Sequence, residues 1–227
     1  MKLSQLIGKR LQIGEKRARE QILAGNALVN GKVFLDPHHP VSRFEEVICD
    51  GRQAQAATSR LFLMVNKPAG ILSATSDPVH RTVLDLIDHP ARATLHLAGR
   101  LDRSSTGLVL LSNDGGWTSL LSDPARLVEK VYLVGTDRPV PADAADRFAE
   151  GFWFATEGIT TRPARLEILE ERFARVTLVE GRYHQIKRMF HRLGGIRLTS
   201  LHRERIGPHE LPADLAPGQW RAIAGIN

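Results

Sequence analysis

The sequence predicts an α+β protein in two parts, a small helix–helix–hairpin module over residues 1–50 and a larger domain over residues 61–227. Apolar residues recur at helical spacing near the start, and an Asn-Gly turn between two apolar runs follows them. After residue 61, short strand-like stretches are interspersed with short helical ones, which is typical of a mainly antiparallel mixed sheet. Residues 51–60 are small and polar without periodicity, and they are expected to be a linker.

Composition bounds the class of protein. The 227 residues are 42% hydrophobic and 25% charged, with a net charge of +6, which is ordinary globular usage. A single cysteine, Cys49, excludes an internal disulfide and a multi-cysteine zinc site, and it fits a reducing compartment. Lys9 and Arg10 interrupt the apolar start, which argues against a signal peptide. We therefore expect a cytoplasmic protein without membrane association.

The first module has one signal for each element. Residues 3–11 carry apolar side chains at helical spacing, and residues 15–24 form a second amphipathic pattern. Gly25-Asn26 then ends this helix, because glycine adopts the left-handed conformation of a C-terminal cap. Asn30-Gly31 predicts a tight hairpin turn, and residues 46–49 suit one further strand.

Cations gather on the two predicted helices of this module. They suit phosphate contacts, although solvated helix faces explain their charge equally well. The order of elements tips the balance, because residues 1–50 resemble the S4-type RNA-binding domain. The resemblance implies an RNA-docking role for these side chains, which are Lys9, Arg10, Lys16, Arg17 and Arg19.

The elements of the larger domain are short. Strands are expected at residues 61–66, 95–98, 108–112, 131–134, 165–169 and 174–179. Helices are expected at residues 82–87, 117–121, 142–150 and 183–193.

Three stretches of this domain carry chemically useful side chains. In residues 99–115, a polar loop places Asp102 between Arg100 and Arg103, just before an apolar strand. Taken alone, such an aspartate is more often a turn residue that accepts hydrogen bonds from backbone amides. Tyr132 alternates with apolar neighbours on a strand, and by itself it is more typical of a core tyrosine than of a catalytic one.

The third stretch, residues 180–205, holds most of the excess charge of the chain. Lys and Arg outnumber Asp and Glu there by five, and aromatic and apolar side chains are interleaved with the cations. A solvated helix face is the plainer interpretation. Cations mixed with flat side chains nevertheless suit a surface that binds phosphates and stacks bases.

Other chemistries have weak support. His38-His39 and the pair His184 and His191 lack carboxylate or cysteine companions at ligand spacing, so no metal site is expected. The sequence also holds no phosphate-binding loop of the Walker or dinucleotide type and no Gly-x-Ser-x-Gly elbow.

Taken together, these stretches resemble the successive motifs of the pseudouridine synthases. The motifs lie at residues 67–70, 99–115, 130–132 and 180–190, in the order of the family. Within the superfamily the chain resembles the RsuA branch, and residues 183–190 and 201–207 are most similar to the member that acts on small-subunit (16S) ribosomal RNA. Residues 103–105, Arg-Ser-Ser, depart from the family pattern, which leaves open only the fine choice of substrate.

The resemblance implies an isomerase that converts uridine to pseudouridine in ribosomal RNA without a cofactor. It assigns the essential carboxylate to Asp102, its cationic partner to Lys187, and stacking on the base with proton removal to Tyr132. Arg100 is expected to fill the space that the flipped base vacates. Further RNA contacts are expected from Arg182, His184, Gln185 and Arg188. We expect a monomer whose partner is ribosomal RNA, free or in a pre-ribosomal particle.

Alternatives remain at this point. A related enzyme could act on large-subunit ribosomal RNA. A non-catalytic ribosomal RNA-binding factor would not need Asp102. A metal-dependent nuclease would use Asp102 and Asp114 as ligands and would require magnesium.

Overall fold

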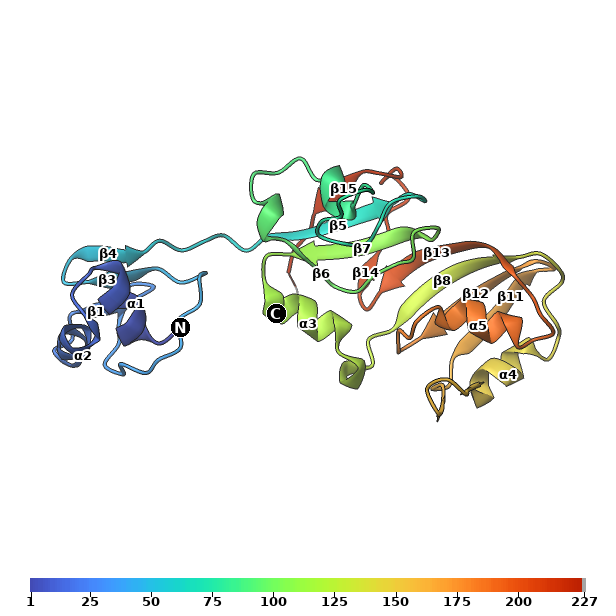
Figure 1. Cartoon of the computed structure of the whole chain (residues 1–227), viewed down its shortest axis with the longest axis horizontal. Coiled ribbons are helices and arrows are strands. Elements are labelled where there is room, and N and C mark those ends of the chain that lie inside the picture. Colours follow the sequence, from blue (N-terminus) through green and yellow to red (C-terminus); the bar gives the residue numbers. More distant parts are fainter. Residues whose placement is uncertain (226–227) are drawn as a thin grey trace. The chain divides into compact units, whose positions relative to one another are not determined.

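A computed structural model describes residues 1–225 of the chain and divides it into two compact units, Met1–Arg60 and a second that begins at Leu61 (Figure 1). Each unit buries a hydrophobic core of its own. No helix within residues 1–225 is long and apolar enough to cross a membrane.

The first unit packs two helices on a four-stranded sheet. Leu3 and Ile7 of the first helix and Ile22 of the second are fully buried in its core. Asn30 and Gly31 both have positive φ, which is what a two-residue hairpin turn requires. The elements are α1 (Leu3–Arg10), α2 (Glu15–Leu23), β1 (Ala27–Val29), β2 (Lys32–Val33), β3 (Val47–Cys49) and β4 (Arg52–Gln55), with strand order β2-β1-β3-β4.

The linker expected over residues 51–60 is wrong in its first half, because residues 52–55 form β4 and pair with β3. Asp50 and Gly51 both adopt positive φ and make the hairpin turn between the two strands. Ala54 is buried in the first core and ties this strand to the unit. The small polar composition of the segment hid this edge strand.

The second unit is built on a mixed sheet in which β13 and β7 run parallel and the other described pairs run antiparallel. The main strand order is β11-β12-β8-β13-β7-β5-β15, with β14 beside β13 and β6 beside β7. The strands are β5 (Phe62–Lys67), β6 (His96–Leu97), β7 (Thr106–Ser112), β8 (Lys130–Thr136), β11 (Arg165–Glu170), β12 (Phe173–Leu178), β13 (Leu198–Ile206), β14 (His209–Glu210) and β15 (Trp220–Ala222). A separate hairpin pairs β9 (Trp153–Phe154) with β10 (Ile159–Thr160).

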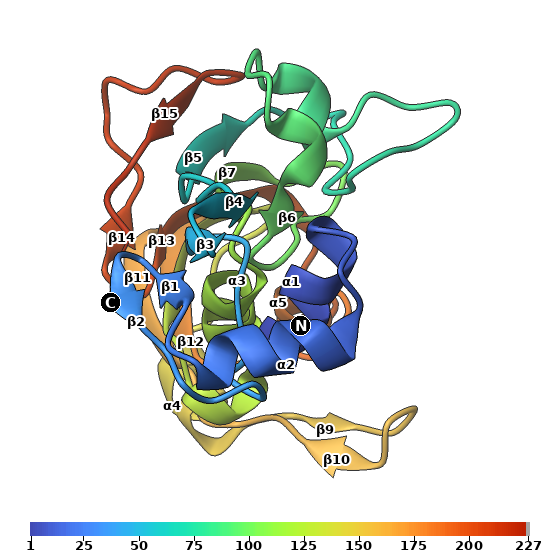
Figure 2. The same cartoon turned by 90° about the vertical axis from the view of Figure 1, so that its left-hand side faces the viewer.

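Both faces of this sheet are covered, as the alternation along β5 shows. Leu63 and Val65 join the larger core, whereas Met64 points to a smaller core on the other face with Trp117. Figures 1 and 2 show α3 on one side of the β5–β7 half and the segment after β5 on the other. The covering elements are α3 (Gly115–Ser122), α4 (Ala144–Glu150), α5 (Gln185–His191), and the 3₁₀ turns η1 (Val83–Leu86), η2 (Arg92–Thr94) and η3 (Pro124–Arg126).

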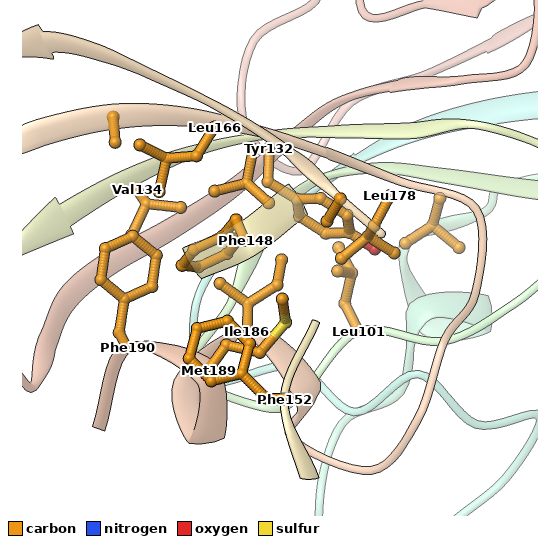
Figure 3. Packing of buried hydrophobic residues seen from close by; sticks show 14 of the residues in the cluster. Leu101, Tyr132, Val134, Phe148, Phe152, Leu166, Leu178, Ile186, Met189 and Phe190 are labelled. Carbon is orange, nitrogen blue, oxygen red and sulfur yellow. The ribbon is translucent and has the colours of Figure 1, made fainter. Parts of the chain in front are cut away.

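Helices α4 and α5 pack on the β8–β12 half of the sheet. Figure 3 shows Phe148 of α4 and Met189 and Phe190 of α5 packed near Val134 and Leu166 of the sheet. The aromatic rings of Phe148 and Phe190 meet edge to face at 5.2 Å. This core fixes the position of α5, which carries part of the candidate site.

Strand β13 was not predicted, although it lies at the centre of the sheet. Residues 202–205 read His-Arg-Glu-Arg, which gives no apolar alternation from which to infer a strand. In addition, residues 82–87 contain a 3₁₀ turn rather than an α-helix, and the helix expected over residues 183–193 begins only at Gln185.

Candidate active site

Asp102 lies in the loop between β6 and β7, and its carboxylate meets two side chains from the far end of the chain. Lys187 Nζ donates to Asp102 Oδ2 at 2.6 Å, and His184 Nε2 lies 3.5 Å from Oδ1. The side chain of Asp102 keeps 30% of its surface exposed. The loop therefore presents an accessible carboxylate beside a fixed ammonium group.

The helical repeat of α5 decides which cation reaches Asp102. His184 caps the helix and Lys187 lies three residues later, so both fall on the same side. Arg188 points about 100° away; its Nη1 lies 2.6 Å from Glu157 Oε1, and its guanidinium lies over the ring of Phe154 at 3.5 Å. The structure thus brings Lys187, and not Arg188, to the carboxylate.

Lys67 is fully buried at the end of β5, and it holds the part of the loop that follows Asp102 in the chain. Its Nζ donates to the carbonyls of Ser105 at 2.7 Å, Pro68 at 3.0 Å and Arg103 at 3.3 Å. Burial lowers the pKa of Lys67 to about 8, and the negative charge of Asp102 opposes part of that shift.

A second buried cation, Arg203 of β13, holds the backbone just before Asp102 and the strand that follows the loop. Only 1% of its surface is exposed. Its Nε donates to the carbonyl of Leu108 at 2.7 Å, and its Nη1 donates to the carbonyl of Arg100 at 3.3 Å. Lys67 and Arg203 together anchor the backbone on both sides of Asp102, and we call them the buried cation pair.

Tyr132 lies opposite Arg203 in the β8–β13 register, and its ring is buried. The Arg203 Nη1 donates to the Tyr132 hydroxyl at a long 3.5 Å, and the guanidinium lies 5.9 Å from the ring centroid. Figure 3 shows Tyr132 beside Leu178 and Leu101, at one end of the core cluster. The ring is therefore fixed in place by its neighbours.

These groups line one narrow pocket of about 100 Å³. Asp102, Lys187 and His184 form its polar side, and Tyr132 with Ile186, Leu178 and Leu201 forms its apolar side. Arg100 is exposed at the same pocket. A flat apolar wall that faces an ionisable carboxylate suits a planar base attached to a polar sugar.

The start of α5 is stabilised by a network around the buried Glu180. Arg182 Nε donates to Glu180 Oε2 at 3.0 Å, and Gln185 Nε2 donates to Glu180 Oε1 at 2.7 Å. Gln185 Oε1 in turn accepts from the Arg182 backbone N–H at 3.0 Å. Both were expected to contact RNA. Gln185 is buried in the pocket wall with both polar ends engaged, and Arg182 pairs with Glu180 and Glu157. Their contact with RNA stays a prediction.

Sequence reasoning gave no role to the buried cation pair. Lys67 belongs to the motif at residues 67–70, and the informative signal is a lysine two residues after the apolar run 61–65. Arg203 also lies in the cationic stretch 180–205, but it was counted there among surface cations. Among residues 1–225, fully buried side chains rarely include cations, so burial is the feature that the sequence could not supply.

Asp114, the second ligand of the nuclease alternative, has a structural task. Its Oδ1 accepts from the backbone N–H groups of Gly116 at 3.0 Å and Trp117 at 3.3 Å, which caps α3. It is not among the residues that line the pocket of Asp102. Within residues 1–225, no three His, Cys, Asp or Glu side chains cluster in a way that could hold a metal ion.

Comparison with known proteins places this geometry in a family. Residues 61–192 match the model of the RNA pseudouridylate synthase family. The ribosomal small subunit pseudouridine synthase A of Pseudomonas aeruginosa is 42% identical over 98% of this chain and 96% of its own length. The protein of the same name from Escherichia coli K12 is 39% identical over 98% and 96%.

A solved structure agrees with these relatives. A crystal structure of a pseudouridylate synthase superimposes with a TM-score of 0.71 at 33% identity, over 99% of this chain and 96% of the other. The Asp102 loop, the Tyr132 strand and the whole Lys187 helix lie within the matched residues 61–192. This chain therefore belongs to the RNA pseudouridylate synthase family.

Proposed function

We propose that this chain isomerises uridine to pseudouridine in small-subunit ribosomal RNA. The observation that carries the proposal is the contact between Asp102 and Lys187 at a pocket walled by Tyr132. The names of its relatives, similar over nearly their full length, support the small-subunit RNA as substrate.

The reaction explains why these residue types are needed. The bond from the sugar C1′ to the base N1 breaks, the base turns, and C1′ joins the base C5, which loses a proton while N1 gains one. The atoms balance without an external reactant, so the step is an isomerisation. The reaction needs a carboxylate at the sugar–base junction, and Asp102 provides one with the Lys187 ammonium 2.6 Å from its Oδ2.

Tyr132 suits two tasks in this scheme. Its buried ring stacks on the base, and its hydroxyl serves in removal of the C5 proton. Arg203, which donates to that hydroxyl oxygen, acts as a positioning residue because it restricts the direction of the O–H bond.

Arg100 is proposed to replace the target base in the RNA stack. Its side chain is exposed at the pocket mouth, and Arg203 holds its carbonyl. Unstacking a base costs a few kcal/mol, which a guanidinium inserted into the space partly offsets.

The first unit is proposed to be an S4-type domain that docks on RNA. Lys9, Arg10, Lys16 and Arg17 are exposed on its helices, whereas Arg19 pairs with Glu15 of its own helix at 2.7 Å. Exposed cations without such a partner release counterions when they meet phosphates.

The proposed function is tested by Asp102→Asn, which keeps the shape of the side chain and removes its charge. We expect pseudouridine formation to fall by at least about 10³-fold, while RNA affinity stays near that of the unaltered protein. Tritium release from small-subunit RNA labelled at uridine C5 measures the reaction, and filter binding measures the affinity. Turnover close to that of the unaltered protein would show that another carboxylate is used.

Lys187→Met and Arg188→Met form a matched pair of adjacent cations. Lys187→Met should lower the single-turnover rate by about 10²-fold, because it removes the counter-charge at 2.6 Å from Asp102. Arg188→Met should change this rate by less than about 3-fold, because Arg188 contacts Glu157 and Phe154 instead. Equal rates for the two variants, with only weaker binding by Lys187→Met, would make Lys187 a phosphate contact.

The lowered pKa of the buried Lys67 makes the stability of the protein depend on pH. Below about pH 8 both the folded and the unfolded chain carry its proton, but between about pH 8 and 10.5 only the unfolded chain retains it. The free energy of unfolding of the natural chain should therefore rise relative to Lys67→Met over this range, by up to about 3 kcal/mol.

Urea titrations followed by tryptophan fluorescence test this prediction, since all three tryptophans lie in the second unit. The difference in stability between the natural chain and Lys67→Met should be constant from pH 6 to 7.5 and grow above pH 8. A difference that is the same from pH 7 to 10 would contradict the lowered pKa of Lys67.

The docking role of the first unit predicts a change in salt dependence. Replacing Lys9, Arg10, Lys16 and Arg17 with Gln in the full chain should weaken RNA binding, and the slope of log K against log salt should flatten by about 0.7–0.9 for each phosphate that the helices no longer neutralise. Single-turnover rates at saturating RNA should recover. An unchanged slope would exclude these helices as an RNA contact.

A further inference from the structure

A second hollow lies along α5, next to the Asp102 pocket. It has a volume of about 590 Å³ and is separate from that pocket, but His184 and Lys187 line both. Its remaining polar lining comes from the rest of α5 and the segment that leads to β13. The polar side chains of this second hollow are His184, Lys187, Arg188, His191, Arg192 and Arg197, and we call it the α5 hollow.

The α5 hollow holds two arginines, Arg192 and Arg197, without an ion-pair partner in residues 1–225, with the imidazole of His191 beside them. All three side chains are exposed. Elsewhere on the same unit, Arg175 pairs with Glu204 at 3.0 Å and other arginines are similarly paired. Unpaired cations gathered in a hollow favour an anionic ligand.

An exposed aromatic ring, Tyr183, stacks on His184, which lines both hollows. Tyr183 is 76% exposed, and its ring stacks on His184 with centroids 3.9 Å apart and planes 21° from parallel. The same His184 lies 3.5 Å from Asp102. His184 therefore lies between the Tyr183 ring and the Asp102 carboxylate, and the other face of the Tyr183 ring is open.

The backbone holds this stack in place. His184 has φ 48° and ψ 32°, a left-handed conformation that a non-glycine residue adopts only when its surroundings require it. Arg188 Nη1 also donates to the Tyr183 carbonyl at 3.3 Å. An exposed ring that already stacks on His184 leaves its outer face open to stack on a base.

We propose that the α5 hollow binds the RNA strand next to the target uridine, with a neighbouring base on Tyr183 and its phosphates against His191, Arg192 and Arg197. This inference rests on the proposed function for the identity of the ligand as RNA. The charge and the aromatic face suit a single strand, because in a duplex both faces of each base are already stacked.

The phosphate contacts are tested on the full chain with a 12-nucleotide single-stranded oligouridylate and fluorescence anisotropy. Arg192→Gln with Arg197→Gln should flatten the salt slope by about 1.4 and weaken binding about 25-fold at 0.1 M salt, since each contact contributes about 0.7 to the slope. The control, Arg126→Gln with Arg172→Gln, removes the same charge from two exposed arginines outside the hollow and should keep the natural slope.

The stacking contact is tested with one 2-aminopurine in the same oligonucleotide, whose fluorescence is quenched when it stacks. Tyr183→Ala should remove the protein-induced quenching and weaken binding about 10-fold, and Tyr183→Phe should recover both, because Phe keeps the ring. Recovery by Phe separates stacking from a hydrogen bond of the hydroxyl.

Two results would overturn the proposal. One is an equal loss of affinity in the double variant and in its control, which would indicate a non-specific effect of charge. The other is natural quenching in Tyr183→Ala. The oligouridylate assay measures binding alone. It therefore tests whether the α5 hollow binds single-stranded RNA even if small-subunit RNA proves not to be the substrate.

Discussion

The site depends on the insertion of β13 between β7 and β8. Of the described strands, β13 is the one that pairs with both, parallel to the strand that follows the Asp102 loop and antiparallel to the strand that carries Tyr132. Arg203 stands in register with Gly107 on one side and with Tyr132 on the other. A Cβ at residue 107 would collide with the Arg203 backbone, so glycine is required for this close approach. The carboxylate and the aromatic ring are thus placed by one strand.

The two buried cations beside the Asp102 loop have no carboxylate as hydrogen-bond partner. Lys67 and Arg203 are both buried, and they donate hydrogen bonds to backbone carbonyls and a tyrosine hydroxyl rather than to carboxylates. Arg203 Nη2 has no hydrogen-bond partner within the described structure. Buried charge without a counter-ion lowers stability, and here it anchors the loop that positions Asp102 and adds positive potential beneath it. We infer that this chain accepts the energetic cost because the two cations hold the loop that places Asp102 at the pocket.

The sequence predicts the side chains of the site more completely than the strands of the sheet. The contact between Asp102 and Lys187 follows from motif order, and the helical repeat correctly separates Lys187 from Arg188. Strand β13 could not be predicted, because polar and charged residues dominate it and its strand partners lie more than 60 residues away in sequence. The burial of Gln185 could not be predicted either, since it is created by Glu180 and the packing of α5. Local patterns identify the chemical groups, but only the tertiary structure decides which of them face solvent.

The most direct measurement is a map of pseudouridine in ribosomal RNA from cells with and without this protein, with carbodiimide adducts read as primer-extension stops. We predict that a stop in small-subunit RNA disappears without the protein, returns with the natural chain, and stays absent when Asp102→Asn is supplied. Small-subunit RNA that keeps every stop without the protein would contradict the proposed substrate. A stop restored by Asp102→Asn would contradict the role of the carboxylate.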